Sequence, residues 1–84
     1  MADFIKVQRL SQTVRVVIEP WFNGKYKVSA QIYNPDYCYG WEVRADGWHN
    51  TSARFSSSLE GAKRVFDEMV RSEQRWLEQR AQQA

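Results

Sequence analysis

Apolar and polar residues alternate over 14–33 on both sides of Asn23-Gly24, and this pattern predicts a β-hairpin. A two-residue turn at Asn23-Gly24 would mix apolar and polar residues on each face. A three-residue loop, a type I turn that ends with Gly24 in the left-handed conformation, pairs Trp21 with Lys25 instead. In this register the apolar residues share one face, which comprises Val14, Val16, Ile18, Val28, Ala30 and Ile32.

The opposite face of the predicted hairpin is polar and aromatic. The same register sets Glu19 opposite Lys27, a favourable charge pair, and Trp21 opposite Lys25, where a cation–π contact can form. The other members of this face are Arg15, Val17, Ser29, Gln31 and Tyr33. The first face packs in the predicted core, so its role is explained. The function of the second face remains to be found.

Three segments after the hairpin carry weaker patterns. Asn34-Pro35-Asp36-Tyr37 predicts a turn, because proline presets φ there. Residues 39–46 alternate and predict a third strand with Trp41, Val43 and Ala45 on one side. Residues 52–55 predict a short fourth strand with Ala53 and Phe55 pointing inward, or irregular chain that only delivers Phe55 to the core.

Residues 57–80 predict one long amphipathic helix. Ser57 and Glu60 have the spacing of a capping box. Apolar residues then recur at helical spacing, namely Leu59, Ala62, Val65, Phe66, Met69, Val70, Trp76 and Leu77. Such a helix is about 35 Å long, and four strands about 4.8 Å apart make a narrower sheet. We therefore expect an overhang, where Trp76 and Leu77 either cap the sheet edge or form a self-association patch for a homodimer.

These elements predict one α+β domain over 1–84. Its fold is a small antiparallel sheet of three to four strands, a β-meander, with one long C-terminal amphipathic helix packed on one face. The sheet takes residues 13–56, the helix takes 57–80, and residues 81–84 form a frayed tail. Residues 1–12 fit either a short strand or a helical turn, and both alternatives stay open.

Composition narrows the class of protein. The chain has 84 residues, of which 43% are hydrophobic and 26% charged, as is typical of one globular domain. No apolar run approaches the roughly 20 residues of a membrane span, and the N-terminus lacks a secretory apolar segment. The single cysteine, Cys38, rules out an internal disulfide and agrees with a reducing compartment. We expect a cytoplasmic protein with no membrane contact.

The inventory of reactive residues argues against catalysis. One histidine, His49, and one cysteine cannot build a metal site of the usual Cys/His composition within the chain. Cys38 and His49 could form a nucleophile pair, but no cation lies near Cys38 in the sequence to favour its thiolate. No glycine-rich run precedes a helix to hold phosphate. We expect a binding protein that is not an enzyme and has no cofactor and no metal.

Aromatic residues exceed what a core of this size needs. The chain holds four Trp, four Tyr and four Phe. Tyrosine and tryptophan in turns and on sheet faces are typical anchors of protein interfaces. They also brace the exposed side of a thin sheet by cross-strand packing, and this alternative stays open. The predicted partner-binding set, with Trp48 in a loop, is Trp21, Lys25, Lys27, Tyr33, Tyr37, Tyr39, Arg44 and Trp48.

The first third of the chain carries one resemblance. Phe4-Ile-Lys6, the apolar strand that follows, Asn23-Gly24 and Lys25-Tyr-Lys-Val28 resemble the start of the small phage anti-CRISPR proteins. Those proteins pack an antiparallel sheet with helices and obstruct a crRNA-guided surveillance complex. The resemblance implies an inhibitor of phage or mobile-element type that covers a surface of a protein or ribonucleoprotein partner. The tyrosine-rich turn after Pro35 departs from it.

A second resemblance implies a different partner. Pro20-Trp21, 25–35 and 55–68 are similar to AP2-type and integrase-arm DNA-binding domains, in which a sheet lays its outer face in the major groove. It implies that phosphates and base edges are bound by Arg15, Lys25, Lys27, Arg44 and Arg54. The inserted strand and the acidic Glu19, Glu42 and Asp46 depart from that pattern. The net charge of +2 is also too balanced to favour DNA, so we expect a protein partner first.

Overall fold

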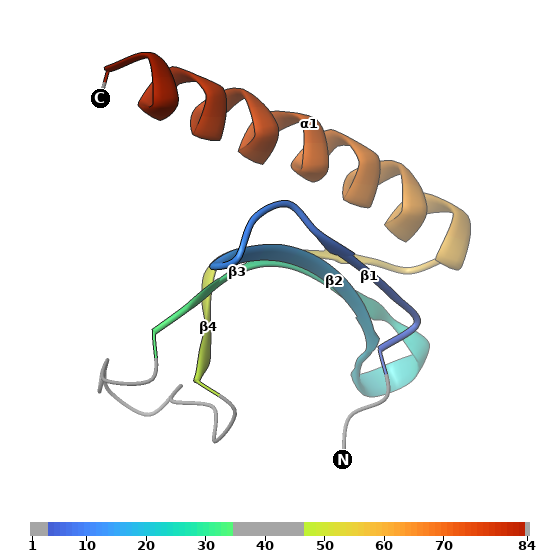
Figure 1. Cartoon of the computed structure of the whole chain (residues 1–84). Helices are drawn as coiled ribbons and strands as arrows, with labels where there is room; N and C mark the ends of the chain where they lie inside the picture. Colours follow the sequence, from blue (N-terminus) through green and yellow to red (C-terminus); the bar gives the residue numbers. More distant parts are fainter. Residues whose placement is uncertain (1–3, 35–46, 84) are drawn as a thin grey trace.

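The computed structural model describes residues 4–34 and 47–83. They form a four-stranded antiparallel sheet in the order β1-β2-β3-β4, with one C-terminal helix on one face (Figure 1). The strands are β1 (Lys6–Arg9), β2 (Val14–Pro20), β3 (Tyr26–Tyr33) and β4 (Trp48–Ser56), and the helix is α1 (Leu59–Gln83). The predicted α+β class, with a small antiparallel sheet and one long helix, is confirmed.

The hairpin of β2 and β3 has the predicted register. Val14 pairs with Ile32, Val16 with Ala30 and Ile18 with Val28. The connection is the 3₁₀ turn η1 (Phe22–Gly24), closed by a hydrogen bond from the Trp21 amide to the Lys25 carbonyl (2.9 Å).

The turn itself differs from the predicted type I geometry in one respect. Asn23 has φ 60° and Gly24 has φ 70°, so both residues lie in the left-handed region, where only Gly24 was expected. Asparagine tolerates this region better than most residues, because its short side chain can hydrogen-bond locally.

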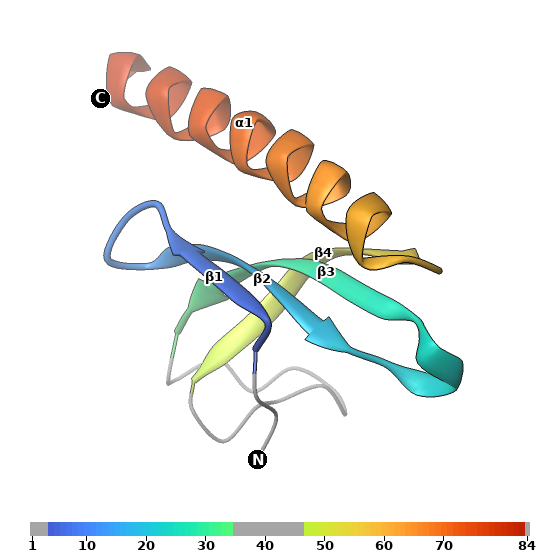
Figure 2. The ribbon, with the colours of Figure 1, turned by 90° about the vertical axis from the view of Figure 1, so that its right-hand side faces the viewer.

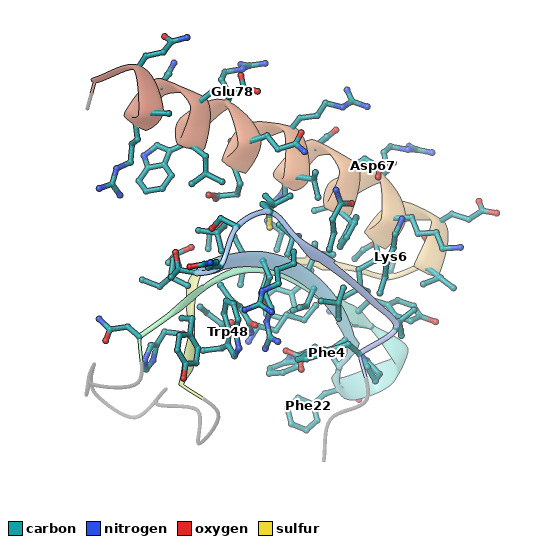
Figure 3. The ribbon with its side chains drawn as sticks, in the orientation of Figure 1. Phe4, Lys6, Phe22, Trp48, Asp67 and Glu78 are labelled. Carbon is teal, nitrogen blue, oxygen red and sulfur yellow. The ribbon has the colours of Figure 1, made fainter. Side chains whose placement is uncertain are left out.

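The core lies between the β2–β3 face and α1. It is formed by Val16, Ile18, Val28 and Ala30 of the sheet with Ala62, Phe66, Met69 and Val70 of the helix. Lys6 of β1 extends this contact, with its Nζ 4.7 Å from the centroid of the Phe66 ring. Asp67 and Glu78 point to the other side of α1, away from the sheet (Figure 3). The helix therefore presents an apolar stripe to the sheet and a charged stripe to solvent.

The start of α1 lies one residue later than the predicted cap. The Gly61 amide donates to Ser58 Oγ (3.1 Å), and the Ala62 amide donates to the Ser58 carbonyl (3.0 Å). Ser58 is thus the N-cap residue, and the capping box predicted for Ser57 and Glu60 is wrong. The predicted frayed tail from 81 is also wrong, since the helix continues to Gln83.

The helix diverges from the sheet along its length. Its first turns lie close to the strands, whereas its C-terminal turns extend past them (Figures 1 and 2). The expected overhang is therefore present.

The N-terminal segment contains a strand. β1 pairs antiparallel with β2, from Lys6 opposite Ile18 to Arg9 opposite Arg15. Of the two alternatives for this segment, the strand is correct. The predicted strand at 39–46 lies outside the described residues, as do all positions of the predicted turn after Asn34.

The last strand, β4, is longer than predicted and has the opposite orientation. It spans Trp48–Ser56 and pairs with β3, where Phe55 lies opposite Lys27 and Ala53 opposite Ser29. These two β3 residues are on the face away from α1, so Ala53 and Phe55 also point away from the core and are exposed. The prediction that they point inward is wrong. Arg54, on the helix side instead, is bonded to Glu68 of α1 at 3.2 Å.

Candidate protein-interaction surface

The middle of the sheet face opposite α1 is buried. Val17, Ser29 and Gln31 have no solvent exposure, although the one α-helix of the described residues lies on the other face. The sheet is arched with its convex side toward α1, so side chains on the concave side converge, with Phe4 and Trp48 among them (Figure 3). The predicted second face is thus largely packed, and only its margins offer free side chains.

Arg15 holds this packed region together. Its guanidinium lies 5.0 Å from the Phe4 ring centroid and 4.2 Å from the Trp48 ring centroid. Arg15 Nε donates to Gln31 Oε1 (2.8 Å), and Gln31 Nε2 donates to Asn50 Oδ1 (2.8 Å). A chain of polar contacts therefore crosses β2, β3 and β4 and satisfies groups that burial would otherwise penalise.

The predicted anchors that the structure describes do not form one patch. Trp48 begins β4 rather than lying in a loop, and it is only 8% exposed, with its ring 5.2 Å from that of Tyr33. Tyr33 and Trp21 are partly exposed but lie at opposite ends of the hairpin, with the length of β3 between them. The other predicted anchors, Tyr37, Tyr39 and Arg44, lie outside the described residues.

Three aromatic rings gather instead at the tip of the hairpin. We call Trp21, Phe22 and Phe55 the hairpin patch. The Trp21 ring lies 5.2 Å from the Phe22 ring and 5.7 Å from the Phe55 ring. Phe22 is 74% exposed and Phe55 is 54% exposed, and Figure 3 shows Phe22 on the side of the molecule away from α1.

A groove of about 460 Å³ adjoins the hairpin patch, and we call it the outer groove. Trp21 and Phe55 form its aromatic wall, Ala53 and Thr51 of β4 line its edge, and Lys27 lies within it. Lys27 Nζ is 4.4 Å from the Trp21 ring centroid. The cation beside Trp21 is thus Lys27, where the sequence pointed to Lys25.

Glu19 and Lys27 are paired as predicted, but only through the backbone. Their Cα atoms are partners in the β2–β3 ladder. Among the described residues, one ion pair has its charged atoms within 4.0 Å, and it joins Arg54 and Glu68. Lys27 takes part in no ion pair with these residues. Lys27 is nevertheless only 8% exposed. The expected ion pair between the Glu19 and Lys27 side chains is therefore not formed, and the Lys27 ammonium has no carboxylate partner among the described residues.

The described members of the basic set predicted to bind DNA do not share an exposed face. Arg15 is held in the packed centre, and Lys27 is buried beside Trp21. Arg54 lies on the helix side and is bonded to Glu68, whereas Lys25 is exposed at the hairpin. Arg44 lies outside the described residues.

His49 has a structural contact in β4. Its Nε2 lies 2.8 Å from the Asn34 carbonyl oxygen, and the side chain is buried. Its predicted partner Cys38 lies outside the described residues. In residues 4–34 and 47–83, no group of three or more His, Cys, Asp and Glu side chains is placed to hold a metal ion. Over the same ranges, no helix is both long and apolar enough to cross a membrane.

Trp76 borders a second groove, on the helix side of β4. This groove measures about 240 Å³ and is lined by Ile32, Thr51, Ser72, Glu73 and Trp76. The Arg80 guanidinium lies 4.9 Å from the Trp76 ring centroid, and Trp76 remains 45% exposed. Leu77 is half-buried.

Phe22 and Phe55 are the surface residues that sequence reasoning missed. The exposure of Phe22 could have been predicted from its position in the hairpin turn, because a side chain at the tip of a turn has no neighbouring strand or helix to bury its ring. For Phe55 no local signal existed, since its alternation with Ala53 fits either face and only pairing with Lys27 decides the side. Comparison of the chain with protein-family models, curated proteins and solved structures gives no match.

Proposed function

We propose that the chain is a non-enzymatic binding domain that captures a protein partner through the hairpin patch. The observation that carries this proposal is the contact of three aromatic rings at the hairpin tip, with Phe22 at 74% and Phe55 at 54% exposure. Contiguous exposed aromatic surface is unfavourable in water and is characteristic of binding sites. Aromatic side chains also dominate the energy of protein interfaces.

The charge pattern supports a protein partner over DNA. A surface that tracks phosphates concentrates basic residues on one exposed face. Here Lys27 is buried and Arg15 is half-buried. Arg54 is exposed but lies on the helix side and is paired with Glu68, so Lys25 remains as the exposed member of the described set that forms no ion pair with the described residues. We therefore place the DNA-binding alternative second.

The resemblance to phage anti-CRISPR proteins supports a narrower version of the proposal. In that version the partner is a crRNA-guided surveillance complex, and the chain inhibits it by covering a surface. The test measures whether the purified surveillance complex binds the immobilised chain and is inhibited by it. If it shows neither binding nor inhibition, the anti-CRISPR function is wrong, whereas the broader proposal of protein binding still stands.

The broader proposal is tested by comparing three forms of the chain as bait. The Phe22→Ser/Phe55→Ser variant removes two rings of the hairpin patch without touching the core. The control, Val7→Ser, removes an exposed apolar side chain from β1, at the other end of the strand order and outside both grooves. We expect a partner that is retained by the unmutated chain and the control and lost by the patch variant, with all three folded by circular dichroism. Identical capture by all three forms would contradict the proposal.

DNA is tested separately by titration with a short duplex at rising salt. Affinity that falls steeply with salt and is lost in Lys25→Glu would support the alternative, because phosphate contacts release counterions.

A further inference from the structure

The outer edge of β4 is open in the sheet formed by residues 4–34 and 47–83. In the sheet that the structure describes, β4 lies at one end of the strand order and pairs only with β3. Each residue from Thr51 to Phe55 is exposed. An exposed edge strand presents unpaired N–H and C=O groups, and natural proteins either protect such an edge or use it to bind an extended chain.

Grooves flank this edge on both faces of the sheet. The outer groove lies on the concave side, and the groove bordered by Trp76 lies on the helix side. Thr51 lines both of them. Because the side chains of a strand alternate between faces, a strand added to β4 would direct successive side chains into the outer groove and the helix-side groove in turn.

Lys27 specifies the chemistry of the outer groove. It is more than nine-tenths buried, and its described contact is the Trp21 ring at 4.4 Å from Nζ. Among the residues that the structure describes, no acidic side chain lines the outer groove. Lys27 Nζ forms no ion pair with the described residues and is not one of their fully buried polar atoms, so the carboxylate of a ligand can reach this ammonium from the groove.

The helix-side groove favours a different side chain. Ile32 and Trp76 give it apolar walls, and Glu73 is its acidic member. An apolar residue fits these walls, whereas a second carboxylate would be repelled by Glu73.

We propose that β4 is the docking edge for an extended segment of a protein partner, which adds a fifth strand to the described sheet. The segment alternates acidic and apolar residues, with an Asp or Glu carboxylate against Lys27 and an apolar side chain beside Trp76. The inference rests on the proposed function, because it specifies how a partner seated on the hairpin patch continues along Phe55 and Ala53.

Charge complementarity excludes a second copy of β4 as the occupant. The sequence of β4, WHNTSARFS, contains no Asp or Glu. A copy paired with β4 would therefore bring Arg54 and no carboxylate to the groove that holds Lys27. The other edge strand, KVQR, also lacks an acidic residue.

The test uses a short capped peptide that alternates glutamate with valine, added to the full chain and followed by backbone amide NMR. We expect saturable shifts at Thr51 to Phe55 and near Trp76. Replacing glutamate by glutamine in the peptide, or Lys27→Met in the protein, should each weaken binding by about tenfold or more. The two changes together should cost little more than either alone, because they remove the same ion pair.

Backbone pairing is tested by N-methylating the peptide at alternate positions. Methylation on the edge that faces β4 should abolish binding, whereas methylation of the intervening amides should leave it unchanged. The inference is overturned if both methylated peptides bind equally, if Lys27→Met has no effect, or if the peptide does not bind. It is likewise overturned if the chain instead dimerises through β4. A partner lost on Phe22→Ser/Phe55→Ser but unaffected by Lys27→Met and by competing peptide would preserve the proposed function while removing strand addition.

Discussion

Lys27 and Trp21 form a cation–π contact across the hairpin, with Nζ 4.4 Å from the ring centroid, although neither residue is the other's partner in the ladder. The backbone of Trp21 pairs with Lys25, so Lys27 is a diagonal neighbour on the same face. Diagonal pairs lie within reach of long and aromatic side chains. This geometry turns the Lys27 side chain toward Trp21 and the outer groove.

Removing the Lys27 charge should stabilise the unbound chain. Methionine keeps the unbranched stem of lysine, and Lys27→Met removes the cost of partly desolvating an ammonium group that forms no ion pair with the described residues. We expect the free energy of unfolding to rise by about 1 kcal/mol, since this cost exceeds the cation–π energy. Urea denaturation measures the change. Lys25→Met, at an exposed position, is the control and should change stability by less than about 0.5 kcal/mol. A loss of stability in Lys27→Met would show that the charge is compensated in the folded chain.

Phe66 is the central residue of the core and has no solvent exposure. Phe66→Ala should reduce the free energy of unfolding by about 3 to 5 kcal/mol, because it leaves a cavity between α1 and the β2–β3 face. The whole free energy of unfolding of a small domain is only about 5 to 15 kcal/mol, so the variant should melt at a much lower temperature. The matched control is Phe22→Ala at the exposed turn, which should melt close to the unmutated chain. An equal loss in both variants would contradict the assignment of the core.

The helix cap distinguishes two adjacent serines. Ser58→Ala removes the acceptor of the Gly61 amide and should cost about 1 kcal/mol. Ser57→Ala removes a side chain that makes no cap contact and should cost less than about 0.5 kcal/mol. Thermal melts of the two variants give the comparison. A larger loss of stability in Ser57→Ala would show that Ser57 is the N-cap residue, as the sequence predicted.

The fold was largely predictable because its main elements repeat a pattern over many residues. In β2 and β3 a register slip of one residue would move the apolar set to the wrong face, so alternation fixes the pairing. In α1 the apolar stripe recurs over several turns, which leaves its face unambiguous. The cap was less certain, since Ser56, Ser57 and Ser58 offer the same hydroxyl at consecutive positions.

The orientation of β4 could not be read from its own sequence. Ala53 and Phe55 alternate with polar residues in the manner of a half-buried strand, yet they face away from the helix. The ladder of β3 and β4 is shifted between Ala30 and Gln31, and such a bulge changes which β4 residues share a face with the core. The candidate site depends on this pairing, because Phe55 joins Trp21 and Phe22 only in the observed register.

The position of Trp76 leads to a prediction about assembly. Its ring is flanked by Arg80 and borders the helix-side groove with Ile32 and Thr51, so it lies beside the helix-facing side of β3 and β4 as well as facing solvent. Of the two alternatives that the sequence left open, this placement favours the cap over a dimer patch. We expect the unmutated chain to sediment as a monomer, and Trp76→Ala to lower the free energy of unfolding by about 1 kcal/mol through lost apolar contact. Sedimentation over a range of concentrations provides the check, with Trp76→Glu as the comparison. A dimer that forms at high concentration and is lost in Trp76→Glu would instead assign the C-terminal turns to self-association, because a charged residue at a twofold contact repels its own copy.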